Sequence, residues 1–241
     1  MPANLALLAA LRDGLAAAAD PAAAGPMQAY MKSSLPFLGV AAPQRRRVVA
    51  AALAQHPLAD AQVLKDTLLR LWRQAQHREE RYAALDLLRP ARHARWIDGT
   101  WLAPLHELLI SGPWWDHNDE ISGHALGLVL QRDPAGVKPV LRQWARGDKL
   151  WLRRAAMLCQ RRLRADFDAV LLYDCILPSL GSDSMAREFF IRKGMGWALR
   201  ERSYAAPDEV QAFVDEYRDR LSPLTRREAL KVIHKRAAAR A

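Results

Sequence analysis

The sequence predicts an all-α fold, an α-solenoid of HEAT-like helix pairs with a concave, basic groove. Three observations lead to this prediction. Apolar residues recur at steps of three and four, strand-like alternation is nowhere sustained, and tryptophan returns at repeat-like intervals. By their residue numbers, Trp72, Trp115, Trp151 and Trp197 lie 43, 36 and 46 residues apart. Paired-helix HEAT or armadillo units are roughly 40 to 47 residues long.

The first expected helices cover residues 4–19, 45–56, 61–72 and 78–88. Each places its apolar side chains on one face, as "AQVLKDTLLRLW" does at residues 61–72. Positions three and four apart lie next to each other on a helix surface, so such a face can be buried against a neighbouring helix.

The same period continues through the rest of the chain, for example in "LWLRRAAMLCQRRL" and "DEVQAFVDEYRDRL". Helices of this length without a sustained heptad pattern favour a solenoid over a compact bundle. The further expected helices cover residues 123–132, 135–146, 150–163, 168–180, 187–201, 208–221 and 224–236.

Short breaks containing proline or glycine separate the expected helices, because proline cannot continue a helix and glycine weakens one. None is long enough to act as a linker, so we expect a single domain over residues 1–241. The breaks are Asp20-Pro21, Gly25-Pro26, Ala42-Pro43, Gly112-Pro113, Asp133-Pro134, Gly147-Asp148, Gly181-Ser182, Ala206-Pro207 and Ser222-Pro223.

The charge balance predicts a polyanionic partner. Lys plus Arg is 36 and Asp plus Glu is 26, which gives a formal net charge of +10. Arginine supplies most of the positive charge, and its planar guanidinium suits phosphate groups. Nucleic acid is therefore the first candidate, and an anionic membrane surface is the alternative that charge alone leaves open.

A reduced, cytoplasmic protein is expected. Cys159 and Cys175 are neither closely spaced nor in a CxxC motif, which indicates buried thiols and no disulfide framework. The apolar N-terminus lacks the leading basic residue of a signal peptide and is interrupted by Arg12 and Asp13. No segment approaches the ~20 apolar residues of a membrane span.

Aromatic and charged residues recur together at spacings that share a helix face. Trp115 and Asp119 are four apart, and Trp151 and Arg154 are three apart, with Arg161 one heptad later. The third set is Lys193, Trp197 and Arg200. Such sets suit a groove that contacts phosphates and sugars.

A purely structural interpretation also fits each of these residues. Tryptophans in helical repeats mostly pack in the core. Carboxylates that follow Gly112-Pro113 can complement the dipole of a helix start, and runs such as Arg45-Arg46-Arg47 are usually solvated faces. The residues that this interpretation also covers include Asp116, Asp119, Glu120, Arg226, Arg227, Lys231 and Lys235.

Five segments resemble, in order, the signature segments of the bacterial DNA alkylation repair glycosylases built from HEAT-like repeats. They are "YMKSSLPFLGVAAPQRR", "LLISGPWWDHNDEI", "WLRRAAMLCQ", "EFFIRKGMGWALRE" and "LSPLTRREALKVI". The resemblance runs from about Pro26 to about Lys235. It implies a monofunctional DNA N-glycosylase that removes 3-methyladenine and 7-methylguanine from duplex DNA without a base-flipping pocket, leaving an abasic site.

The resemblance also implies roles for individual residues. Asp119, Trp115, Arg154 and Trp197 match the catalytic cleft, and Tyr30 matches a tyrosine that lines the same groove. Asp119 is expected to stabilise the cationic sugar, the indoles to lie against it, and Arg154 to bind a nearby phosphate. The further expected DNA contacts are Arg45, Arg46, Lys193, Arg200, Arg227 and Lys231.

No cofactor or metal is expected, and the protein is expected to act as a monomer. HExxH, GxSxG and a cysteine cluster are absent, so His117 and His124 do not indicate a zinc site. Lys149 and Lys193 do not indicate a lyase. The sequence departs from the family pattern at Gly194 and Gly196, which weaken the helix that carries Trp197.

Two other classes of protein stay open. A helical-repeat scaffold that binds protein would present an apolar stripe. A non-catalytic binder of damaged or branched DNA, or of RNA, would share the basic groove but would not need Asp119.

Overall fold

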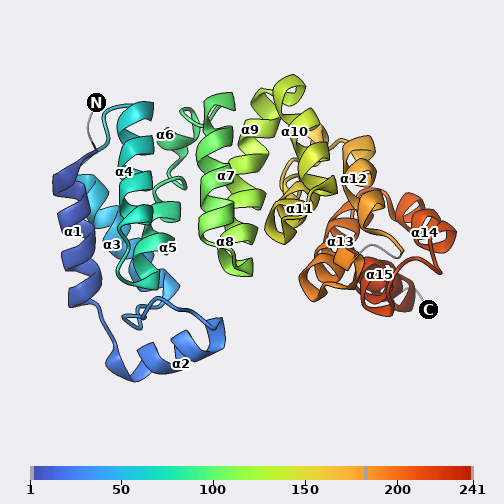
Figure 1. Cartoon of the computed structure of the whole chain (residues 1–241), viewed down its shortest axis with the longest axis horizontal. Coiled ribbons are helices and arrows are strands. Elements are labelled where there is room, and N and C mark those ends of the chain that lie inside the picture. Colours follow the sequence, from blue (N-terminus) through green and yellow to red (C-terminus); the bar gives the residue numbers. More distant parts are fainter. Residues whose placement is uncertain (1–2, 182–183, 240–241) are drawn as a thin grey trace. The chain divides into compact units, whose positions relative to one another are not determined.

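The structure, a computed structural model, describes residues 3–181 and 184–239, and across these residues every regular element is helical (Figure 1). This confirms the predicted all-α fold of HEAT-like helix pairs. The chain forms two compact units, Met1–Ile97 and Asp98–Ala241. No helix in the described part of the chain is long and apolar enough to cross a membrane.

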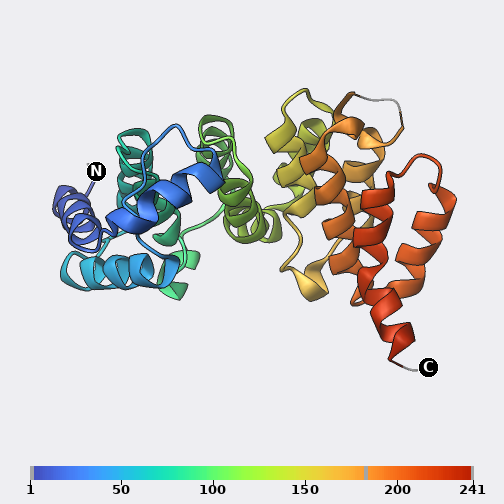
Figure 2. The same ribbon diagram turned by 90° about the horizontal axis from the view of Figure 1, so that it is seen from below.

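The N-terminal unit is a stack of short helices in which α1 packs on α3 and α4 packs on α5, while α2 crosses one end of the stack (Figures 1 and 2). Leu7, Leu11 and Leu68 are fully buried between these helices, and Trp72 is almost so. The helices are α1 (Leu5–Ala17), α2 (Pro21–Met31), α3 (Ala42–Gln55), α4 (Ala61–Arg73), α5 (Arg78–Asp86) and α6 (Ala91–Ala94).

Polar residues of the sequence set where several of these helices begin. The Asn4 side chain accepts a hydrogen bond from the Leu7 amide, and the Asp60 side chain accepts one from the Val63 amide. Each bond satisfies an amide that has no partner inside its own helix. These caps explain why helices form where the apolar period starts.

A buried carboxylate organises the chain between α2 and α3. Glu79 is fully buried on α5, and its two carboxylate oxygens accept hydrogen bonds from the amides of Leu38, Gly39 and Val40 at 2.9 to 3.1 Å. Gly39 has a φ of +83°, and a side chain there would overlap the Asp20 carbonyl. The "PFLGV" segment therefore serves the fold of the N-terminal unit.

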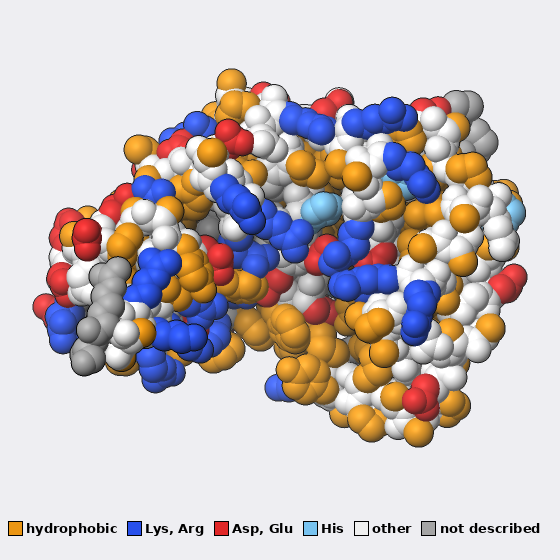
Figure 3. All heavy atoms as spheres, turned by 180° about the vertical axis from the view of Figure 1, so that it is seen from behind, with side chains coloured by type: hydrophobic (Ala, Val, Ile, Leu, Met, Phe, Trp, Pro, Cys, Tyr) orange, Lys and Arg blue, Asp and Glu red, His pale blue; other side chains and the backbone are white. Residues whose placement is uncertain are grey.

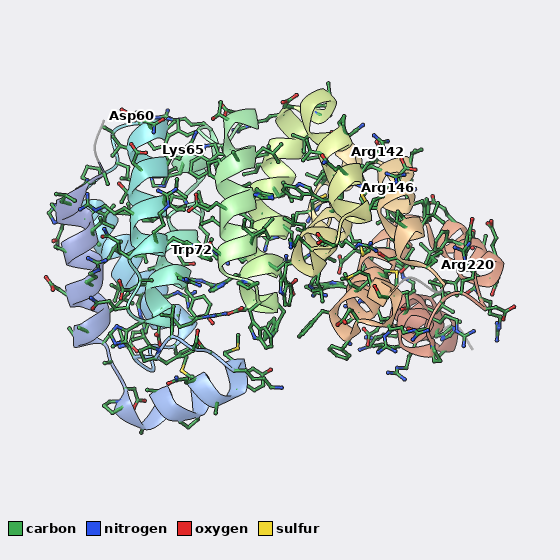
Figure 4. The ribbon with its side chains drawn as sticks, viewed as in Figure 1. Asp60, Lys65, Trp72, Arg142, Arg146 and Arg220 are labelled. Carbon is green, nitrogen blue, oxygen red and sulfur yellow. The ribbon has the colours of Figure 1, made fainter. Side chains whose placement is uncertain are left out.

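The C-terminal unit continues the pattern of antiparallel helices, and α13 packs along α15 (Figure 2). An ion pair joins α10 to α12, in which the Arg142 Nε lies 2.7 Å from the Asp174 Oδ2. Arg142 is labelled in Figure 4. The α-helices are α7 (Leu102–Ser111), α8 (Trp115–Glu120), α9 (Gly127–Arg132), α10 (Pro134–Arg146), α11 (Leu150–Leu158), α12 (Ala169–Ile176), α13 (Phe189–Ser203), α14 (Pro207–Glu216) and α15 (Pro223–Ala238).

Shorter helical turns join these helices. A π-helical turn over Ile121–Leu126 connects α8 to α9, so residues 115–132 form one helix with a wide middle turn. The 3-10 turns are Gly99–Trp101, Arg164–Asp166, Leu177–Ser179 and Ser184–Arg187.

The structure corrects the helix ranges expected from the sequence. Helices α2, α6 and α7 lie where no helix was expected, and Gly25-Pro26 lies inside α2 rather than between helices. Asp20 caps α2 by accepting from the amides of Ala22 and Ala23, so the helix begins before Pro26 and continues past it. The expected break at Gly181-Ser182 includes a residue outside the described part of the chain.

Gly196 allows α13 and α15 to approach closely. A Cβ on this glycine would lie 2.6 Å from the Glu228 Cβ and 2.9 Å from the Thr225 carbonyl oxygen. The departure from the family pattern at this position therefore has a packing reason, because α13 and α15 meet here without an intervening side chain.

Both cysteines are buried thiols, as expected from their spacing. Burial raises the pKa of the Cys175 thiol to about 12. Burial also raises the pKa of the Cys159 thiol well above its ordinary value. Neither thiol is therefore suited to act as a nucleophile near neutral pH.

Candidate functional site

Helix α8 positions the acid and indole that the sequence singled out. Trp115 begins this helix and Asp119 lies one turn later, and both are partly exposed. The π-helical turn follows directly, and such turns are often found at functional sites. At this junction the Ser122 hydroxyl donates to the Asn118 carbonyl at 2.6 Å. The local geometry confirms that Trp115 and Asp119 lie one turn apart on a single helix.

Arg154 from α11 binds the Asp119 carboxylate with two parallel hydrogen bonds. Its Nε donates to Oδ1 at 2.8 Å and its Nη2 donates to Oδ2 at 2.9 Å. The Arg154 side chain is 4% exposed and that of Asp119 is 16% exposed. A bidentate pair fixes the orientation of a carboxylate more firmly than a single bond does. Asp119 is thus held rigidly while part of it remains open to solvent.

Arg154 is buried and fully engaged at its three nitrogens. Its Nη1 donates to the Phe190 carbonyl at 2.6 Å, so all three guanidinium nitrogens have partners inside the protein. In this structure the charge of Arg154 therefore acts on Asp119, and the expected phosphate contact of Arg154 stays a prediction.

Gly194 gives the Arg154 guanidinium its space. A Cβ at this position on α13 would lie 3.1 Å from Arg154 Nη1, which is closer than ordinary van der Waals contact. The second departure from the family pattern is thus next to the site. A glycine here lets α13 pass close to the buried ion pair.

An aromatic cluster lies beside the ion pair. The ring centroids of Trp151 and Phe190 are 5.0 Å apart, and Trp114 lies 5.5 Å from Phe190 and 6.0 Å from Trp151. The Asn118 amide donates to the Trp151 carbonyl at 2.6 Å. Trp151 therefore packs against other aromatic rings, as the structural interpretation of the sequence expected, and it helps fix α8 against α11.

Trp197 on α13 is restrained from two directions. Its Nε1 donates to Glu201 Oε1 at 2.9 Å. The Arg161 Cζ lies 3.9 Å from the centroid of the Trp197 ring, and Arg161 Nη2 donates to the Asp119 carbonyl at 2.7 Å. One face of the Trp197 ring is therefore occupied by a cation of the protein itself.

A basic hollow lies along α13 and α15. Lys193, Trp197, Arg200, Glu228 and Lys231 line it. The Lys193 Nζ and the Arg200 Nη1 each lie 2.6 Å from a different oxygen of Glu228. The structure thus brings four expected site residues together around a carboxylate that the sequence did not indicate.

The two cations change the acidity of Glu228. The hydrogen bond from Lys193 is the largest influence that lowers the pKa of the Glu228 carboxyl, and the charge of Arg200 acts in the same direction, while burial opposes both. With two cations around one ionised carboxylate, and with Lys231 at its edge, the hollow keeps a net positive charge. This charge suits a phosphate ligand.

A further expected DNA contact, Arg227, is exposed on α15, four residues before the exposed Lys231. Blue Lys and Arg side chains are spread over the visible face of both units in Figure 3. In the part of the chain that the structure describes, no group of three or more His, Cys, Asp or Glu side chains could hold a metal ion.

The expected residues of the N-terminal unit divide into exposed and buried ones. Tyr30 on α2 is 75% exposed, and Arg46 on α3 is exposed. Arg45 is buried, its Nε donates to Asp86 at 2.8 Å, and its guanidinium lies over the Tyr82 ring. Arg45 therefore stabilises the N-terminal unit, and its expected contact with DNA stays a prediction.

Sequence reasoning missed Glu201, Glu228 and Phe190 at the site. The sequence does not indicate Glu228 as a site residue, because Glu228 lies in a basic segment whose pattern is typical of a solvent-exposed helix face. Arg161 was placed in line with Arg154, but its contacts with Asp119 and Trp197 bridge different helices. Of the close contacts around the site, only those at Gly194 and Gly196 were visible in the sequence, as departures from the family pattern.

The fold and the site together define a basic, all-helical repeat protein in which a buried arginine, Arg154, holds the carboxylate of Asp119. The sequence profile of the family described as DNA alkylation repair enzyme matches residues 11–233, and the chain belongs to this family. No curated protein matches the sequence significantly.

A solved structure, described as a predicted DNA alkylation repair enzyme from Enterococcus faecalis, is similar to most of this chain. The two sequences are 27% identical, and the match covers 88% of this chain and 95% of the other, with a TM-score of 0.72. Family and fold agree on a role in DNA repair.

Proposed function

We propose that this protein is a monofunctional DNA N-glycosylase that hydrolyses the glycosidic bond of cationic alkylpurines, such as 3-methyladenine and 7-methylguanine, in duplex DNA. The observation that carries the proposal is the bidentate Arg154–Asp119 pair, which holds a partly exposed carboxylate one turn from Trp115. Membership in the DNA alkylation repair enzyme family supports alkylated DNA as the substrate.

The reaction does not need a general acid to protonate the leaving group. An alkylated purine carries a positive charge, so it accepts the electron pair of the breaking C1′–N bond and leaves as a neutral base. The costly event is the positive charge that develops on the deoxyribose, as in glycoside hydrolysis. A fixed carboxylate beside this sugar stabilises that charge without having to reorganise.

Asp119 suits this role because its geometry is set before the substrate arrives. Each oxygen accepts one hydrogen bond from Arg154 and retains a further lone pair. A water bonded there can be oriented toward C1′. Its oxygen forms the new bond to C1′, and its proton passes to the carboxylate or to solvent. The product is an abasic site with a free base.

The half-exposed Trp115 ring is proposed to lie against the sugar and exclude bulk water. An indole face attracts a cation by about 0.5 to 2 kcal/mol, so this contact favours the charged transition state. Trp197 serves less directly, because Arg161 already occupies one of its faces. We propose that the DNA backbone is held by Lys193, Arg200, Arg227 and Lys231, together with Tyr30 and Arg46 of the N-terminal unit.

Release of base from a duplex with a single 7-methylguanine, under single-turnover conditions, tests the proposal. We expect Asp119→Asn to lower the rate by roughly 10² to 10³, the usual effect of losing one preorganised electrostatic group, with little change in DNA affinity. Asp116→Asn, the same substitution on the same helix, is the matched control and should keep the wild-type rate. Thermal melting checks that both variants fold.

The outcomes separate the two candidate functions. Wild-type release that only Asp119→Asn loses supports the glycosylase. No release by wild type, with tight duplex binding retained, would contradict it and favour a non-catalytic DNA binder. Equal release by wild type and Asp119→Asn would remove Asp119 from the reaction.

A further inference from the structure

We propose that Arg161 is a positioning residue, one that sets the main chain of Asp119 and the ring of Trp197 in a fixed relation to each other. The proposal rests on the glycosylase function proposed above. Arg161 lies in the turn that follows α11, and its side chain reaches both α8 and α13. No other described contact joins Asp119 to Trp197 through one side chain.

The two contacts restrain different parts of the site. Arg161 Nη2 donates to the Asp119 carbonyl at 2.7 Å, so it holds the backbone at the start of the π-helical turn. Its guanidinium stacks 3.9 Å from the Trp197 ring centroid, and a half-buried stack of this kind is stronger than an exposed one. Arg154 holds the Asp119 carboxylate, whereas Arg161 holds its carbonyl.

Charges of both signs surround Arg161. Burial lowers the pKa of the Arg161 guanidinium, while the negative charges of Asp119 and Glu201 raise it and the positive charges of Arg154 and Arg162 lower it. Glu201 also accepts from the Trp197 Nε1. The ring is thus fixed at its nitrogen by an acid and on its face by a cation.

Gly123 provides the space that Arg161 occupies. A Cβ at this position, in the π-helical turn, would overlap Arg161 Nη2, and the three nearest atoms all belong to the Arg161 guanidinium. A methyl group here would displace Arg161 without removing its charge. The chain therefore offers two independent ways to disturb one contact.

Arg161 is expected to influence rate and not affinity. It is half-buried and its Nη2 is engaged with Asp119, so it is poorly placed to bind a phosphate. A shift of about 1 Å in a reacting group can cost up to ~10²-fold in rate. Releasing Asp119 and Trp197 from Arg161 permits such a shift.

The test compares Arg161→Met, Arg161→Lys and Gly123→Ala in the full chain, with Arg162→Met as the control for the loss of one positive charge. We expect Arg161→Met and Gly123→Ala each to lower the single-turnover rate by roughly 10-fold, with the Kd for duplex DNA unchanged within about 2-fold. Arg161→Lys should recover part of the rate, because lysine can still donate to the Asp119 carbonyl.

The double variant Gly123→Ala with Arg161→Met distinguishes positioning from general damage. Methionine has no guanidinium to overlap with the new Cβ, so the double variant should be no slower than Arg161→Met alone. Independent effects that multiply would overturn the proposal. So would a rate in Arg161→Met equal to or above wild type.

A spectroscopic readout does not depend on activity. The indole ¹⁵N–¹H signal of Trp197, assigned by its loss in Trp197→Phe, should shift in Arg161→Met and in Gly123→Ala but not in Arg162→Met. An unchanged signal in Arg161→Met overturns the proposal. If wild type releases no base, the glycosylase proposal fails, and this signal alone decides whether Arg161 positions the ring.

Discussion

The orientation of each charged residue in the site is set by the residues with which it forms ion pairs and hydrogen bonds. Asp119 is oriented by Arg154, which is buried and bonded to Asp119 and to the Phe190 carbonyl. Glu228 gathers Lys193 and Arg200, and so fixes two cations that would otherwise repel each other. In both cases ion pairs orient a group that solvent can still reach.

Glu228 gives a prediction about pH. The pKa of its carboxyl is lowered in the folded protein from an ordinary value of 4.5. Its contribution to the free energy of unfolding is therefore fully present well above that value and is lost as pH falls through the lowered pKa. Glu228→Gln should lower the Tm at pH 7, and the difference from wild type should shrink toward pH 3, as followed by circular dichroism.

Asp148→Asn is the control for this prediction, because the Asp148 side chain is 84% exposed. Its Tm should follow that of wild type across the same pH range. A constant Tm difference between wild type and Glu228→Gln at every pH would contradict the assigned role of Glu228.

Helix α13 is the element on which the site depends most. It carries Lys193, Trp197 and Arg200, it supplies the Phe190 carbonyl to Arg154, and it packs along α15. Its two glycines lie on the faces that meet Arg154 and α15. Glycine lowers the intrinsic stability of a helix, and here that cost is offset by closer packing around the ion pair.

Gly196→Ala should destabilise the protein more than Gly14→Ala does. At Gly196 the new methyl group would meet the backbone of α15, at the Thr225 carbonyl and Cα, as well as the Glu228 Cβ. At Gly14 the three nearest atoms all belong to the half-buried Val48 side chain and none to the backbone of a neighbouring helix. We expect a loss of about 1 to 3 kcal/mol for Gly196→Ala, measured by urea unfolding. A smaller loss than for Gly14→Ala would contradict the close approach of α13 and α15.

At the scale of the whole molecule, the net charge of +10 is distributed over both units. Much of the interior charge is paired, as in Arg45 with Asp86 and Arg154 with Asp119. The exposed cations are those that can meet a polyanion. Binding to duplex DNA should therefore be electrostatic in large part and should weaken as salt rises.

The salt dependence of duplex binding tests which cations take part. The double substitution Arg227→Ala with Lys231→Ala should reduce the slope of log Kd against log salt by about 1.8, because each lost phosphate contact accounts for roughly 0.9. Arg142→Met, whose charge is already paired with Asp174, should leave the slope unchanged. Fluorescence anisotropy at a series of salt concentrations gives the slope for wild type, the double variant and Arg142→Met. An unchanged slope in the double variant would exclude Arg227 and Lys231 from the interface.

The sequence by itself determined the fold class and the local part of the site. Helical periodicity and the i to i+4 relation of Trp115 to Asp119 are properties of one segment, so they can be read without knowledge of the fold. The same holds for the Lys193, Trp197 and Arg200 stripe, which the structure gathers in one hollow.

Only the tertiary structure decided which side chains meet between helices. The bonds from Arg154 to Asp119, from Arg161 to Asp119 and from Lys193 to Glu228 each span 35 residues or more of sequence. Whether a charge is buried in such a pair or left for a ligand depends on how helices pack, and periodicity carries no information about that. This is why the sequence did not predict that Arg154 pairs with Asp119 or that Arg45 pairs with Asp86.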